Sequence, residues 1–246
     1  MDTTIDRGST APATTPAARM ELYTPIHKAL RALMGHTLEV VGRADPADAE
    51  DVARALDAAR ALLHACAHHL ENENRFVHPA MESRLPGSSA GTAEDHVGHE
   101  QAIDEVEAQV RAVERTSGAR RNAAMLALYR RLARFVADNF EHMHEEETHN
   151  QQILWATHSD DELLAIEGAI VGSIPPQDMQ ALLPWMLRGN AHAERVAILG
   201  GVRASAPPEV FQGMLAAARA TLDARDWSKL ARALAVPEGS GPVERW

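Results

Sequence analysis

The chain has 246 residues, which is enough to bury a substantial core, and it carries a formal net charge of −11 and a single cysteine. The acidic balance, without a basic patch, argues against a nucleic-acid partner, and one cysteine excludes an intramolecular disulfide and fits a reducing compartment. Ala, Leu, Arg and Glu dominate and aromatic residues make up only 4%, so we predict an all-α protein.

The first eighteen residues are rich in Thr, Ala and Pro and lack the basic start and apolar stretch of a signal peptide. We therefore expect a disordered tail over residues 1–18. No segment approaches about 18 consecutive apolar residues, so we expect no contact with a membrane and a cytoplasmic location.

Turn signals divide the next part of the chain into four long helices. Asp45-Pro46, Pro86–Ser89 and Thr116–Gly118 separate predicted helices at 19–43, 46–84, 92–115 and 119–157. Short connections force neighbouring helices to run antiparallel. We therefore predict an up-down-up-down four-helix bundle over residues 19–157.

The first helix places one imidazole on its apolar face. His27 shares a side with Tyr23, Leu30 and Met34, whereas His36, nine residues further on, points away. His27 is therefore a candidate for an inward-facing ligand.

The second helix carries a His-x3-Glu pair, His69 and Glu73, on or beside its apolar stripe. Four residues rotate an α-helix by about 40° and raise it by about 6 Å, so this imidazole and this carboxylate point the same way. His78 comes nine residues after His69, half a rotation away, and we expect it in solvent.

The third helix offers two imidazoles. Both His96 and His99 fall on the stripe that Ile103, Val106 and Val110 continue. Either residue can be the inward ligand, and so can both.

The fourth helix repeats the pattern of the second. The stripe of Leu128, Leu132 and Phe135 leads by a step of seven to His142, and Glu146 follows four residues later. Two facing His-x3-Glu helices would supply two bridging carboxylates and two imidazoles, which predicts a dinuclear metal site if the other helices add imidazoles.

The spacing alone is weak evidence, because it recurs elsewhere among thirteen His and a lone buried His is more often a hydrogen-bonded core residue. The joint occurrence of inward-facing His and Glu residues on four helices carries more weight. Buried carboxylates are costly without a partner, and no Lys or Arg shares the stripes of Glu73 and Glu146. A metal ion is the natural compensation. The remaining imidazoles on these helices mostly leave the inner stripe, so we expect them in solvent or around the ligands: His64, His68, His144 and His149.

Beyond residue 157 the pattern changes to short amphipathic helices. Ser159 and Glu162 form a predicted capping box, and the proline pairs Pro175-Pro176 and Pro207-Pro208 separate the later helices. We interpret residues 158–246 as a helical extension that docks on the bundle or serves self-association. It contains no ligand cluster, and we do not expect catalysis there.

Over roughly residues 20–157 the chain resembles the hemerythrin-like (HHE cation-binding) family. The resemblance lies in the order His, His-x3-Glu, His, His-x3-Glu across four helices, and in Pro79 ten residues after His69. It implies an antiparallel four-helix bundle with a non-haem di-iron centre, bridged by oxide or hydroxide and by the two Glu, with the His terminal. The ligands that it implies are His27, His69, Glu73, His96 or His99, His142 and Glu146. The invertebrate oxygen carriers pair two His four apart in the third helix, whereas here the step is three.

More imidazole than carboxylate suits iron, and the small molecules we expect at such a centre are O2, NO and H2O2. Three functions fit: a di-iron protein that binds or senses O2 or NO, an oxidoreductase that consumes peroxide or NO, and an iron-storage, iron-donor or metal-stabilised interaction module. The titratable groups near the site slightly favour redox chemistry over transport.

Overall fold

A computed structural model describes residues 19–239 of the chain, so the expected disordered tail at 1–18 lies outside the described residues. Residues 19–239 form helices and no strand, which confirms the all-α prediction. The helices of the first part are α1 (Thr24–Arg43), α2 (Ala49–Asn72), α3 (His78–Arg84), α4 (Ala90–Glu114), α5 (Ala119–Glu145) and α6 (Gln151–Thr157). Those of the second part are α7 (Asp160–Ser173), α8 (Pro176–Gly189), α9 (His192–Ser205), α10 (Pro208–Thr221) and α11 (Ala224–Ala233). None of them combines the length and apolarity that crossing a membrane requires.

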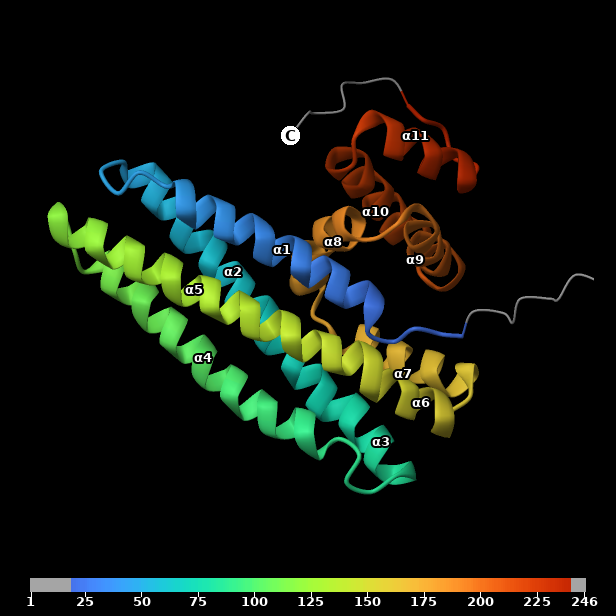
Figure 1. Cartoon of the computed structure of the whole chain (residues 1–246). Helices are drawn as coiled ribbons and strands as arrows, with labels where there is room; N and C mark the ends of the chain where they lie inside the picture. The colour runs from blue at the N-terminus through green and yellow to red at the C-terminus, as the bar shows by residue number, and fades with distance from the viewer. Residues whose placement is uncertain (1–18, 240–246) are drawn as a thin grey trace, which may run out of the picture.

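Four long helices form a bundle around one apolar core. α1 packs against α2 and α5, and α4 packs against the same two helices, as Figure 1 shows. Leu30, Leu62, Val106, Leu128 and Phe135 fill the centre and are almost completely buried. Removing these side chains from water is the main force that holds the helices together.

Local hydrogen bonding decides where two of the helices begin. α2 starts three residues later than predicted, because the Asp48 side chain accepts hydrogen bonds from the backbone N–H groups of Glu50 and Asp51. Asp45 instead accepts from the N–H of Ala47 at 2.8 Å and forms the preceding turn. The predicted capping box of Ser159 and Glu162 is confirmed at the start of α7.

Two π-helical segments interrupt the long helices, and each begins at the Glu of a His-x3-Glu pair. η1 (Glu73–Val77) joins α2 to α3, and η2 (Glu146–Asn150) joins α5 to α6. A π turn contains about one extra residue, which shifts everything beyond it by roughly 100° around the helix axis. His78 consequently turns inward and is buried, so the expectation that it lies in solvent is wrong.

Helix α7 covers the end of the bundle at which these π segments lie. Leu163 of α7 packs with Tyr23, Val77, Met81 and Leu154 in a small apolar cluster of its own. The α7 segment therefore closes that end of the bundle against water.

Helices α8 to α11 build a separate core and dock beside α1 (Figure 1). Trp185 of α8 packs against the bundle core, and the Asn190 side chain donates a hydrogen bond to the carbonyl of Pro25 at 2.9 Å. Gly189 lies against the α1 backbone so closely that a Cβ there would overlap the carbonyl oxygen of Lys28. The second part of the chain thus holds the first turns of α1.

Because of this close contact, adding a single methyl group at Gly189 should destabilise the protein. Gly189→Ala should lower the free energy of unfolding by about 1–3 kcal/mol, because α8 must move away from the rigid α1 backbone. Gly213→Ala is the matched control: a Cβ on Gly213 meets no atom of residues 19–239 within 4 Å, so we expect a gain of about 0.5–1 kcal/mol from the better helix former. Urea denaturation of both variants measures the difference, and equal stabilities would show that α8 does not press on α1.

Candidate metal centre

Six side chains from four helical stretches meet inside the bundle, in two groups of potential metal ligands. The first donor group is His27, His69, Glu73 and Glu146, and the second donor group is Glu73, His96, His142 and Glu146. In each group one ligand atom per residue lies within 4.8 Å of all the others. Both groups share the two carboxylates, so the arrangement has the form of two adjacent sites with a common pair of bridges.

The first donor group joins α1 and α2 to the two π segments. The Nε2 atoms of His27 and His69 are 3.1 Å apart. His69 Nε2 lies 3.2 Å from Glu73 Oε1, and His27 Nε2 lies 3.4 Å from Glu146 Oε2. The two imidazoles therefore face one oxygen of each carboxylate.

The second donor group uses the other two carboxylate oxygens. The Nε2 atoms of His96 and His142 are also 3.1 Å apart. His96 Nε2 lies 3.5 Å from Glu73 Oε2, and His142 Nε2 lies 3.4 Å from Glu146 Oε1. Each carboxylate thus presents one oxygen to each pair of imidazoles.

The two carboxylates are buried without hydrogen bonds. Among residues 19–239, none of the four carboxylate oxygens of Glu73 and Glu146 has a hydrogen-bond partner. An unpaired buried carboxylate costs several kcal/mol or more, and here two share one cavity. Cations between these oxygens and the imidazole nitrogens would satisfy all of them at once, so the residues fit a metal pair.

The pKa values of the two carboxylates reflect this crowding. Burial and the neighbouring charge of Glu146 raise the pKa of Glu73 to about 7. Burial also opposes the ionisation of Glu146, but the imidazoles around it, His142 first, outweigh burial and hold its pKa well below the usual range. Without metal, Glu146 is therefore ionised and Glu73 about half ionised at pH 7, so the pair carries between one and two negative charges.

The two imidazoles of the first donor group also have opposite pKa shifts. Burial opposes the charged form of His27, but Glu146 and Glu147 overcome it and raise its pKa to about 10. Burial and the nearby His27 instead lower the pKa of His69 to about 3. At pH 7 one imidazole of the first donor group is thus protonated and the other is neutral.

Outer partners orient two of the imidazoles. Glu147 Oε1 lies 3.1 Å from His27 Nδ1 and is itself held by Arg31. The side-chain oxygen of Asn74 lies 2.8 Å from His96 Nδ1. In the neutral imidazole, a hydrogen bond from Nδ1–H leaves the lone pair on Nε2, which faces the carboxylates, and such partners are characteristic of metal-binding His.

The family model described as the Hemerythrin HHE cation binding domain matches residues 20–154, which include all six donors. The chain belongs to this family. Searches of curated proteins and of solved structures found no match to it. The donor cluster of this hemerythrin HHE domain is therefore the candidate site for its cations.

The structure brings six of the seven residues proposed from the sequence into the two donor groups and leaves His99 outside both. His99 is buried, and its ring centroid lies 4.6 Å from that of His142. Burial and the nearby His142 lower the pKa of His99 to about 4. His78, unexpectedly, stacks on His96 with ring centroids 4.8 Å apart.

Sequence patterns did not reveal the polar groups that surround the donors. Asn74 gave no signal because a polar residue next to Glu73 has the sequence pattern of an ordinary exposed helix position, whereas in the structure it lies in η1. Thr92 Oγ1 lies 3.3 Å from His78 Nε2 and accepts a hydrogen bond from the Asn150 side chain at 3.2 Å. The four-residue step from Glu146 to Asn150 was the available clue, because it places both side chains on the same helix face.

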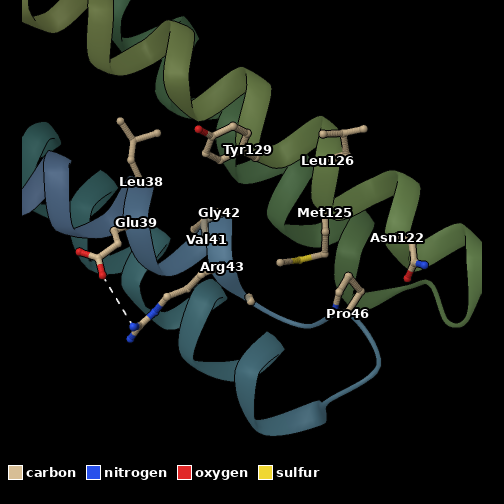
Figure 2. Close-up of a pocket in the computed structure, with 11 residues that line it drawn as sticks. Leu38, Glu39, Val41, Gly42, Arg43, Pro46, Asn122, Met125, Leu126 and Tyr129 are labelled. Carbon is tan, nitrogen blue, oxygen red and sulfur yellow. Dashed lines mark ion pairs between the residues drawn. The ribbon is translucent and has the colours of Figure 1, made fainter.

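Two surface grooves lie at opposite ends of the hemerythrin HHE bundle. The groove in Figure 2, of about 550 Å³, runs between the end of α1 and the start of α5 beside Gly42 and Tyr129, and no donor residue lines it. The other groove, of about 830 Å³, is lined by Thr92, Asn150 and His149 among others. Thr92 lies beside His78, which stacks on the donor His96, so the second groove reaches the side chains next to the donor cluster.

Metal loading should release protons. Because the pKa of His27 is about 10 and that of Glu73 about 7, His27 is protonated and Glu73 about half protonated at pH 7, and a metal must displace these protons. We expect about one to two protons per chain to be released at pH 7, and metal affinity to rise as pH increases toward 10. Calorimetric titration in buffers of different ionisation enthalpy measures the number.

The variant His27→Ala should release fewer protons than the wild type in the same titration. A binding heat that does not depend on the buffer would show that neither His27 nor Glu73 is a ligand.

Proposed function

We propose that this protein holds a non-haem di-iron centre that binds a small molecule, O2, NO or H2O2, and serves in its sensing or detoxification. The supporting observation is the sharing of Glu73 and Glu146 between two pairs of imidazoles, with one carboxylate oxygen toward each pair. Sites of imidazole and carboxylate with open positions are characteristic of non-haem iron.

The proposed ligands of one iron are His27 and His69, and those of the other are His96 and His142, with Glu73 and Glu146 bridging. His96 is preferred to His99 because its Nε2 lies within 3.5 Å of Glu73 and 3.7 Å of Glu146. His99 would then support the His142 ring from the side. Four protein ligands leave open positions in an octahedral shell.

The arrangement of the helices is consistent with the antiparallel up-down-up-down order that the family resemblance implies. α1 and α2 are joined by a short turn and pack together, and so do α4 and α5. In that order the two His-x3-Glu stretches run in the same direction, so both glutamates reach the same depth of the bundle.

A pair of ferrous ions can supply electrons to a bound oxygen, nitric oxide or peroxide molecule. The protein contributes a buried hydroxyl group that can donate a hydrogen bond. Tyr23 is buried with its ring centroid 5.5 Å from that of His27. Burial and the charges of Glu146 and Glu73 raise the pKa of Tyr23 well above its usual value, so its hydroxyl keeps its proton at pH 7.

The second groove gives this donor a connection to water. Asn150 donates hydrogen bonds from its side-chain amide to Tyr23 Oη at 3.5 Å and to Thr92 Oγ1 at 3.2 Å. Both Asn150 and Thr92 line the groove of about 830 Å³. We infer that small molecules and protons approach the centre from this side.

Metal content tests the ligand assignment. Iron-loaded wild-type protein should contain about two irons per chain, because the donors exceed what one ion can use. Glu73→Ala and Glu146→Ala should fall below about one iron, since each carboxylate would hold both ions. His144→Ala is the control: it lies two residues from His142 but is exposed, and should retain the wild-type content. Equal iron in all variants would refute the assignment.

The same measurement distinguishes the two imidazoles of α4. His96→Ala should lose about half of the iron or more, and His99→Ala should keep most of it. The reverse result would mean that α4 is rotated relative to the carboxylates and that His99 is the ligand.

Function is tested with the reduced, iron-loaded protein. We expect stoichiometric NO, O2 or H2O2 to change its visible absorption spectrum, and Glu73→Ala to show no such change. An oxygen electrode and a peroxide assay then separate reversible binding from turnover. If iron passes readily to a chelator and none of the three molecules alters the spectrum, the protein is an iron store or donor and the proposed function is wrong.

A further inference from the structure

A second cluster of metal-binding side chains lies on the outside of the bundle, where α2 faces α8. His64 and His68 are one turn apart on α2, and Asp178 belongs to the first turn of α8. His64 Nε2 lies 3.0 Å from Asp178 Oδ1, and His68 Nε2 lies 3.6 Å from Asp178 Oδ2. The ring centroids of the two imidazoles are 4.4 Å apart.

These three residues have the geometry of a ligand set. One donor atom from each lies within 4.8 Å of the other two, which is the only such group outside the buried centre among residues 19–239. Two imidazoles four apart on a helix point the same way and can bind one ion together. A carboxylate as third ligand completes a set that zinc uses, with a fourth position open to water.

The cluster is separate from the buried centre. His68 precedes His69 in sequence, but one residue turns a helix by about 100°, so the two imidazoles serve different faces of α2. Cys66 lies between His64 and His68 in sequence and points into the core, where it is 2% exposed and cannot reach them. The side chains of His64 and His68 are 56% and 39% exposed, so an ion from solvent can enter without unfolding of the bundle.

We propose that His64, His68 and Asp178 bind a single divalent cation of the zinc type, and that this ion clamps α8 to α2. Its ligands come from residues 114 positions apart in the chain. Glu71 Oε2 lies 3.9 Å from His68 Nδ1 and would orient that ring. Because α8 also packs on α1 beside Lys28, the ion would strengthen the docking that supports the turn of His27.

The test uses the full chain with its iron already loaded, so that added zinc and bound iron can be counted separately. Equilibrium dialysis against Zn²⁺ should show one zinc beyond the iron in the wild type. In His64→Ala/His68→Ala the zinc affinity should fall by about a hundredfold, and in Asp178→Asn by about tenfold. His144→Ala, another exposed imidazole of the bundle, should bind zinc as the wild type does.

Hydrogen exchange reports on the clamp itself. Zinc should slow the exchange of the amides in the first two turns of α8 in the wild type, because binding to the docked state makes its opening less frequent. The same zinc concentration should leave these amides unchanged in Asp178→Asn. This variant preserves the size and polarity of the side chain, so it decides the question even if the double variant folds poorly.

Three outcomes would overturn the proposal. If the wild type takes up no zinc beyond its iron, the cluster is only an ion pair. If zinc binds while an equal amount of iron leaves, and equally in the double variant, the zinc belongs to the buried centre. If zinc affinity and exchange in Asp178→Asn match the wild type, there is no clamp between α2 and α8.

Discussion

Glu73 and Glu146 lie together in the interior of a helical bundle, and four imidazoles are arranged around their charges. Neither carboxylate has a hydrogen-bond partner in the part of the chain that the structure describes, and burial alone would push both toward the neutral form. Imidazoles, rather than Lys or Arg, surround the two carboxylates. A protonated imidazole such as His27 can neutralise part of this charge and can also give up its proton to a cation, which an Arg cannot do.

The backbone also changes its conformation where these two carboxylates are buried. Each glutamate begins a π-helical segment, and the extra residue turns the next stretch of helix toward the cluster. His78 is buried as a result, and it joins Asn150, Thr92 and Tyr23 in a polar layer between the donors and the surface groove. Burial of a polar side chain is tolerable there because each has a partner.

The second part of the chain contributes to the centre without supplying a ligand to it. Helix α7 covers the end of the bundle. Helix α8 packs against the α1 backbone at Lys28, the residue after His27. A helix that carries one ligand must be held in place as firmly as those that carry two, because metal geometry tolerates little displacement. The pairing of Lys28 with Glu194 and the Asn190 hydrogen bond to Pro25 belong to the same support.

The sequence by itself determined the helices and most of their inward faces, because a 3.6-residue period and a capping box are local properties of the chain. Those properties were enough to place the His-x3-Glu pairs inside and to predict the start of α7. Only the tertiary structure decided that His96 rather than His99 faces the carboxylates, that His78 is buried, and that His68 meets Asp178. The position of His78 depends on a π turn, that of His96 on the rotation of α4 against its neighbours, and the contact of His68 on the docking of α8. All three are set by packing between segments that are distant in the sequence.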